Sequence, residues 1–160
     1  MARLKEDKRA ADLKQILIFR LHGQRYGVDI LNVAEVISYQ EPTDVFHTPP
    51  YVVGILNLRG VVIAIFDTAS FFELPKSEVR PTTRILVIRS KEAGTEQEAG
   101  FIVDEVIGAR RIAAQNICPP PHTLTGAIRE YISGVLEESE GPLTLMSFDR
   151  IFVSEKVASL

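Results

Sequence analysis

The chain has 160 residues, of which 46% are hydrophobic, so it can build one domain or two small subdomains that share a core. Its net charge of −3 and scattered basic residues argue against nucleic acid as a partner, because nucleic-acid-binding domains concentrate basic charge on one face. A single cysteine excludes an internal disulfide framework, and with no signal peptide and no run of ~20 apolar residues a cytoplasmic protein is predicted.

The first third of the chain alternates short apolar runs with turn formers. Strands are predicted at residues 16–21 and 25–30, whereas residues 33–39 fit either a strand or a helical stripe. A connection rich in proline follows. In it, Pro50 is expected to open a short helical turn that ends near Gly54.

Residues 51–67 are the most informative stretch of the sequence. Two apolar runs, residues 52–58 and 61–66, meet at Arg59-Gly60, and a tight hairpin turn is predicted there because glycine adopts positive φ without a Cβ penalty. Nearly every position of both runs is apolar, so both faces of the hairpin are expected to be covered. The arginine at its tip is then either held by the chain itself or presented to another molecule.

The second half of the chain repeats this pattern. Asp67 is expected to cap a short helix, residues 77–83 to form a linker, and residues 90–99 to form a polar loop. Further strands are predicted at residues 85–89, 100–106 with a continuation to 112, 131–136 and 143–148, with a terminal helix from Asp149. About ten short strands with close turn signals indicate an all-β barrel or sandwich.

Three segments recur in the same order, at offsets of 69, 73 and 70 residues. Their common order favours two similar β subdomains over chance likeness between apolar strands. The paired segments are 16–20 with 85–89, 27–29 with 100–102, and 34–37 with 104–107.

The sequence contains no catalytic or metal-binding pattern. The three histidines lie in separate segments, none at metal-ligand spacing with Cys118. Nucleophile-elbow, phosphate-loop and dinucleotide motifs are not found. Asp104 and Glu105 are neighbours on a predicted strand and would point to opposite faces, so they are not expected to share a site. Together with Glu35 and Arg59, they are either satisfied charges or the rim of a protein-binding groove.

Five ordered motifs extend from about Gln15 to Phe148. They are Gly27-Val-Asp-Ile30 with Val33-x-Glu35-Val36, Thr48-Pro49, Gly54-Ile-Leu-Asn-Leu-Arg-Gly-Val-Val62, Asp67, and Gly100-Phe-Ile-Val-Asp-x-Val106. Together they resemble the CheW family of bacterial chemotaxis coupling proteins, and the Asn-Leu-Arg-Gly hairpin is the most specific piece. The Phe46-His47 and Arg110-Arg111 pairs are not part of the family pattern.

The resemblance implies an all-β fold of two small five-stranded β-barrel subdomains packed on a shared hydrophobic core, with short helices at connections and at the C-terminus. We expect a charged tail at residues 1–14, the CheW-like domain at 15–150, and a C-terminal helix or tail at 151–160. The chain is expected to cross between the subdomains near residues 75–84 and again near the C-terminus.

The resemblance also implies a function: a non-enzymatic adaptor without a cofactor that joins chemoreceptors to a CheA-type histidine kinase and meets the membrane only through receptors. Carried over by position, a groove between the barrels would bind the helical-hairpin tip of a receptor, and a second face would bind the kinase's regulatory domain. The receptor-binding residues would be Val33, Glu35, Arg59, Gly60, Gly100 and Val106, and the kinase-binding residues Gly54 and Ile85. We also hypothesise that Arg59 pairs with a carboxylate at the groove.

Other interpretations stay open at this point. The chain could be a CheW-like module detached from a larger kinase, or a small β-barrel ligand-binding protein or enzyme with a pocket between the barrels. A nucleic-acid-binding barrel is disfavoured because aromatic residues do not alternate with Lys and Arg on any strand. Exposed edge strands of two barrels can also pair, so self-association in rings is a further interpretation.

Overall fold

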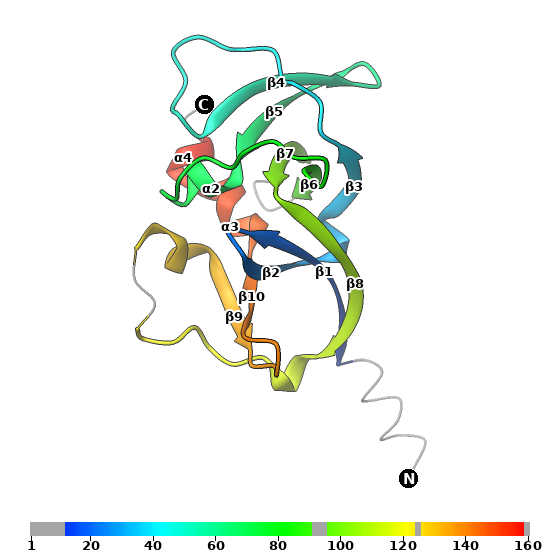
Figure 1. The fold of residues 1–160 in the computed structure, drawn as a ribbon, viewed down its shortest axis with the longest axis vertical. Helices are drawn as coiled ribbons and strands as arrows, with labels where there is room; N and C mark the ends of the chain where they lie inside the picture. Colours follow the sequence, from blue (N-terminus) through cyan, green and yellow to red (C-terminus); the bar gives the residue numbers. More distant parts are fainter. Residues whose placement is uncertain (1–11, 91–95, 124–125, 159–160) are drawn as a thin grey trace.

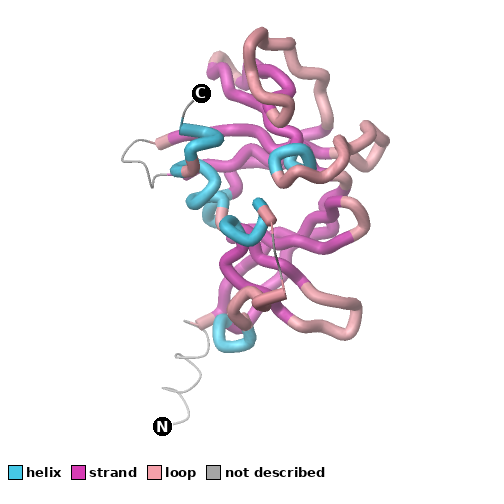
Figure 2. Tube along the Cα trace, turned by 90° about the vertical axis from the view of Figure 1, so that its left-hand side faces the viewer, coloured by secondary structure: helices cyan, strands magenta, loops and turns pink. Residues whose placement is uncertain are grey.

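The computed structural model describes residues 12–90, 96–123 and 126–158. In this part of the chain, ten strands form two five-stranded sheets, with short helical segments at connections and near the C-terminus (Figure 1). Figure 2 shows the two strand-rich halves one above the other. The predicted all-β fold of two five-stranded units is thereby confirmed.

The first sheet has the order β8-β1-β2-β10-β9 and the second β3-β6-β7-β5-β4. Most neighbours are antiparallel, but β10 pairs with β2, and β5 with β7, in parallel. The strands are β1 (Leu13–Leu21), β2 (Gln24–Asp29), β3 (Val33–Ser38), β4 (Val52–Leu58), β5 (Val61–Asp67), β6 (Arg84–Ser90), β7 (Gln97–Val103), β8 (Glu105–Ala113), β9 (Ile132–Leu136) and β10 (Leu143–Met146). The helical segments are η1 (Ile30–Asn32), α2 (Thr68–Phe71), η2 (Ala114–Asn116), η3 (Ala127–Tyr131), α3 (Phe148–Val153) and α4 (Glu155–Ala158).

The buried side chains form three clusters, which explains the unbroken apolar runs in the sequence. Alternate residues of a strand point to opposite faces. In β1, Ile16 and Ile18 point to one face of the first sheet and join a cluster within it, while Leu17 and Phe19 point to the other face and join a core shared by both sheets. In β6 the same alternation divides residues 85–88 between the interior of the second sheet and the shared core. Both strands are covered on both faces, as their composition requires.

The chain passes between the sheets at two short segments. It leaves the first sheet after β2 through η1 and returns after β7 at Asp104, whose backbone N–H donates to the carbonyl of Arg20 at 3.0 Å. The predicted crossing near residues 75–84 is wrong, because these residues connect α2 with β6 inside the second half. The predicted single strand over residues 100–106 is likewise wrong, because Asp104 divides it between two sheets.

Several local predictions are corrected by tertiary contacts. Residues 33–38 form a strand because they pair with β6. Residues 50 and 51 form only a single turn, in which the Val52 N–H donates to the Pro49 carbonyl at 3.0 Å, and it does not extend toward Gly54 because β4 starts at Val52. The terminal helix starts at Phe148 and is capped by Ser147, one residue before the predicted start. The predicted cap at Asp67 is confirmed: its Oδ2 accepts from the Ser70 N–H at 3.1 Å.

The ends of two predicted segments also differ from the structure. β1 already begins at Leu13, inside the predicted tail at residues 1–14, of which residues 1–11 lie outside the described part of the chain. Of the predicted polar loop at residues 90–99, Ser90 belongs to β6 and residues 97–99 to β7, while 91–95 lie outside the described residues.

The two sheets are related by the internal repeat. Each strand from β1 to β5 has an equivalent five strands later, so that β1 corresponds to β6 and β5 to β10. If every strand is exchanged for its equivalent, the strand order of the first sheet becomes that of the second. The three recurring sequence segments fall on β1/β6, β2/β7 and β3/β8, which are equivalent under this exchange. Each sheet therefore combines strands from both repeats, because the last three strands of each repeat lie in the opposite sheet from its first two.

Candidate functional site

The tip of the β4–β5 hairpin is a two-residue turn. Leu58 pairs with Val61, so Arg59 and Gly60 alone close the hairpin. Their φ values of 52° and 84° are both positive, as a type I′ turn requires. The side chain of Asn57 supports the turn, because its Oδ1 accepts from the Gly60 N–H at 2.9 Å. The turn predicted at Arg59-Gly60 is thereby confirmed.

Arg59 is tied to β3, at the opposite edge of the same sheet, and still faces solvent. Its guanidinium pairs with the carboxylate of Glu35 on β3, although its side chain is 81% exposed and that of Glu35 27%. The carboxylate partner hypothesised from the sequence is thus Glu35. Exposed ion pairs contribute only about 0–1 kcal/mol of stability, so this pair mainly orients the hairpin tip.

A shallow hollow of about 160 Å³ lies beside this ion pair. Its walls come from β3, the hairpin, β6 and β7, and include a second ion pair, Arg89 with Glu98 at 3.0 Å. Arg89 also contacts Glu96, outside these walls, at 2.8 Å. Sequence reasoning missed Arg89 and Glu98. They face each other in the β6–β7 register, which requires knowing how two strands pair.

The hairpin exposes apolar side chains next to these charges. Val61 is 55% exposed and Val62 60% exposed, so the expectation that both faces of the hairpin are covered is wrong for its outer half. β4 is an edge strand and the tip extends beyond the core, whereas the inner residues Ile63, Ile65 and Phe66 are buried. The surface around Arg59 is therefore apolar with a charged rim.

Val33 and Val106 lie at corresponding places, directly after the two crossings. Val33 follows η1 and Val106 comes two residues after Asp104. Both are half-buried and pack against the shared core. They flank the junction of the two sheets.

Three of the predicted site residues are buried and cannot touch a partner directly. Ile85 is fully buried inside the second sheet. A Cβ on Gly100 would come within 2.5 Å of Ile65 Cδ1 and 2.9 Å of Ile85 Cγ2. A Cβ on Gly54 would meet the carbonyl oxygen of Thr43 at 2.2 Å. Changes at these positions would act on a partner only by displacing the surface above them.

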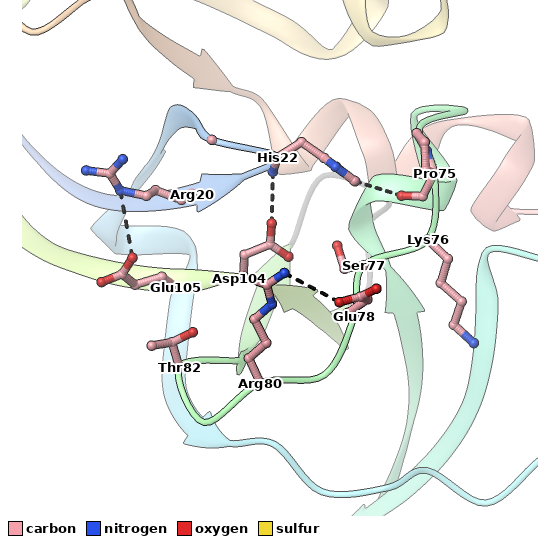
Figure 3. A pocket seen from close by; sticks show the side chains of 11 residues that line it. Arg20, His22, Pro75, Lys76, Ser77, Glu78, Arg80, Thr82, Asp104 and Glu105 are labelled. Atoms are coloured by element: carbon pink, nitrogen blue, oxygen red, sulfur yellow. Dashed lines mark hydrogen bonds and ion pairs between the residues drawn. The ribbon is translucent and has the colours of Figure 1, made fainter.

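A hollow of about 540 Å³ lies at the second crossing (Figure 3). His22 joins its walls: the backbone N–H donates to Asp104 Oδ2 at 2.8 Å, and the ring Nε2 donates to the Pro75 carbonyl at 2.7 Å. Arg20 contacts Glu105 at 3.8 Å, and Arg80 contacts Glu78 at 3.4 Å. His22 therefore joins the first sheet to the α2–β6 connection, whereas the two ion pairs lie within the first sheet and within that connection. None of these groups is a nucleophile with an adjacent base.

Neither a metal centre nor a membrane-spanning helix is found in the described part of the chain. No group of three His, Cys, Asp or Glu side chains there could hold a metal ion. None of the helices described is long and apolar enough to cross a membrane.

Comparison with known proteins agrees with this architecture. A family model described as a CheW-like domain matches residues 15–156. The chemotaxis protein CheW of Klebsiella aerogenes is 30% identical over 145 residues, covering 91% of this chain and 85% of that protein. Protein FrzA of Myxococcus xanthus is 30% identical over 141 residues, covering 86% and 84%.

A solved structure gives the same result. The crystal structure of the scaffolding protein TtCheW from Thermoanaerobacter tengcongensis matches with a TM-score of 0.78 and 29% identity, covering 89% of this chain and 90% of that one. The chain therefore belongs to the CheW-like family and is a non-enzymatic chemotaxis coupling adaptor.

Proposed function

We propose that the chain binds the helical-hairpin tip of a chemoreceptor on one face and the regulatory domain of a CheA-type histidine kinase on another. The receptor face comprises Val33, Glu35, Arg59, Gly60 and Val106, with Gly100 supporting it from inside. The kinase face lies over Gly54, with Ile85 beneath it. Two modest contacts on one small adaptor suit assembly by multivalency, in which linked weak contacts reinforce one another.

The Arg59–Glu35 pair is the observation that carries the receptor face. It fixes an exposed guanidinium at a rigid turn, beside the exposed Val61 and Val62. An amphipathic helix needs such a surface, since apolar residues supply its affinity and charged residues at the rim set its register. A guanidinium carries five N–H donors, so Arg59 can bind a polar helical side chain while it remains paired with Glu35.

The buried members of the two faces act through packing. Gly100 lets Ile65 and Ile85 approach each other across β7, and these side chains fill the interior of the second sheet. A larger residue at position 100 would push apart β5 and β6, which flank β7. The hairpin and β6, which pairs with β3, belong to that sheet. The receptor face would therefore change shape although none of its contact residues is replaced.

Arg59→Ala tests the receptor face. We expect this variant to weaken binding to a receptor-tip fragment about tenfold, as for hot-spot arginines, while its thermal unfolding stays close to that of the wild type. Arg80→Ala is the matched control, because Arg80 is also exposed and ion-paired but lies away from the hairpin. Equal receptor affinity of Arg59→Ala and the wild type would remove Arg59 from the site.

Coupling itself is tested by reconstitution of receptor fragments, kinase and adaptor, with kinase autophosphorylation as the readout. The proposal expects autophosphorylation to depend on receptor only when the adaptor is present. Sedimentation of all three proteins together with an unchanged kinase rate would contradict coupling and leave scaffolding alone.

A further inference from the structure

Phe46 is the one phenylalanine that the fold leaves outside. Its side chain is 86% exposed, whereas the other seven are at most 4% exposed. It belongs to residues 39–51, here called the Phe46 loop, which connects β3 with β4. Keeping this aromatic side chain in water forgoes about 1.5–3 kcal/mol of burial, so a binding role is the natural explanation to test.

The Phe46 loop is held in place by its own hydrogen bonds. Thr43 forms an antiparallel bridge with Ile55 of β4, with both N–H···O bonds at 2.9 Å. Thr48 Oγ1 donates to the carbonyl of Val45 at 3.1 Å. His47, directly after Phe46, is held at φ = 61°, which is uncommon for a residue with a side chain. A loop ordered before binding has less entropy to lose on association, so it presents Phe46 as a preformed anchor.

The surroundings of Phe46 define the chemistry of its partner. Val45 beside it is 39% exposed, and the loop also exposes Glu41 and Asp44. Residues 39–51 contain no Lys or Arg. The matching surface is an apolar socket with a basic rim, because buried aromatic anchors and complementary charges are how such contacts gain affinity and specificity.

The position of the loop separates it from the receptor face. In Figure 1 it arches over the outer end of the second sheet, opposite the junction with the first sheet. The loop rests on Gly54, since a Cβ there would collide with the Thr43 carbonyl and come within 3.1 Å of Pro42 Cβ. A second copy of this chain fits poorly as partner, because the hollow of about 540 Å³ at its second crossing is no apolar socket but is lined by charges of both signs, among them Arg20, Lys76, Glu78, Arg80, Asp104 and Glu105.

We propose that Phe46 is the anchor through which this adaptor binds the regulatory domain of the kinase, entering an apolar socket rimmed by basic residues. The inference rests on the proposed function and gives it a contact residue. Gly54 acts beneath this contact as a positioning residue, because it lets Thr43 pair with the edge of β4. The exposed side chain that touches the kinase is Phe46.

Phe46→Ala tests the inference in the full chain. Its dissociation constants for the purified kinase and, separately, for a receptor-tip fragment are measured by titration calorimetry at fixed salt. Kinase binding should weaken at least about tenfold, while receptor binding stays within about twofold. Phe46→Tyr should keep most of the kinase affinity, since the ring is retained. Val79→Ala is the matched control, because Val79 is 58% exposed and lies outside both faces.

The acidic flank gives an independent readout. Asp44→Lys should weaken kinase binding and make it less sensitive to salt, because a favourable charge contact is replaced by repulsion. Gly54→Ala should lower kinase affinity in the same direction as Phe46→Ala and should leave receptor affinity unchanged.

Several outcomes would overturn the inference. If the wild type binds both partners and Phe46→Ala binds the kinase with the same affinity, Phe46 is not the anchor, and the proposed function stays intact. A loss confined to receptor binding, or to self-association measured by sedimentation, rejects the kinase as the occupant. Wild-type protein that binds receptor but no kinase rejects both the inference and the coupling function.

Discussion

Arg59 occupies a backbone position that suits its residue type poorly. Position 59 has φ = 52° in a type I′ turn, where Asn and Gly are preferred because a Cβ is strained at positive φ. The guanidinium reaches Glu35 from this strained position and stays largely exposed. A residue retained against local backbone preference suggests a role outside the fold.

Replacing Arg59 by Asn separates stability from binding. Asn tolerates positive φ, so Arg59→Asn should match or exceed the wild-type free energy of unfolding, by up to about 1 kcal/mol, although the ion pair is lost. Its affinity for a receptor tip should fall as in Arg59→Ala. The measurements are urea unfolding and receptor titration on the same preparation; a destabilised Arg59→Asn with normal receptor affinity would contradict the argument.

Glu138 is the carboxylate whose environment most clearly affects its protonation. Hydrogen bonding from Arg110, with a further contribution from Arg25, holds the pKa of Glu138 below its usual value. A lowered folded-state pKa adds stability that is complete above the unfolded-state pKa and is lost as the pH falls through the folded-state value. The pair therefore ties the 137–142 turn to β2 and β8 at neutral pH and releases it in acid.

Glu138→Gln is expected to lower the free energy of unfolding at pH 7 by about 2 kcal/mol, because hydrogen bonds from two arginines lose their charged acceptor. The difference from the wild type should shrink as the pH falls through the lowered pKa of Glu138, where this carboxylate itself becomes protonated. Urea unfolding between pH 7 and pH 3 measures this. A constant difference across that range would show that charge is not involved.

At the scale of elements, two glycines in equivalent strands both leave room for side chains of the neighbouring strands. Gly27 in β2 and Gly100 in β7 each lie under the side chains of the flanking strands. A Cβ on Gly27 would meet Ile16 Cγ2 at 2.6 Å and Leu145 Cδ2 at 2.8 Å, and the contacts at Gly100 are as short. In each sheet, a bare backbone in the middle strand lets the neighbouring side chains close over it.

Gly27→Ala and Gly100→Ala should therefore destabilise the protein by similar amounts, about 1–3 kcal/mol each, through overpacking. Gly23→Asn serves as the control, since position 23 has φ = 77°, which Asn tolerates, and no atom lies within 4 Å of an added Cβ. Thermal or urea unfolding compares the three. If only one of the two core glycines proves sensitive, the equivalence of the sheets does not extend to their interiors.

At the scale of the whole molecule, neither repeat contains a complete sheet. The first sheet takes β1 and β2 from the first repeat and β8, β9 and β10 from the second, and the second sheet reverses this division. The shared core joins Phe19 and Tyr26 of the first sheet with Phe66 and Phe101 of the second and with Phe148 of α3. The C-terminal end also returns to the second half, where Lys156 Nζ donates to the Phe71 carbonyl at 2.8 Å.

A split between residues 78 and 79 tests this interleaving. Each fragment keeps five strands but only two strand pairings of its own, because the other four pairings and the shared core need both fragments. Neither fragment alone should therefore unfold cooperatively. Mixing the two should restore β-sheet circular dichroism and cooperative unfolding. A fragment that folds alone would show that a repeat can close its own sheet.

The sequence by itself determined the all-β class, the number of repeated units, the Arg59-Gly60 turn and the absence of catalytic motifs. These follow from local causes: apolar periodicity, glycine at a turn, and the residue types available for chemistry. Asp67 as a helix cap also belongs here, since a cap depends only on the residues that follow it.

Only the tertiary structure decided which strands pair and therefore which residues share a surface. The crossings at η1 and Asp104, the Arg89–Glu98 pair and the Glu35 partner of Arg59 all depend on contacts between segments far apart in the chain. An apolar run has the same composition whether it lies in a core or at an exposed tip, so Val61 and Val62 could not be told from Ile63 and Ile65 in advance. The fold alone shows that the one exposed phenylalanine stands on the outer end of the second sheet.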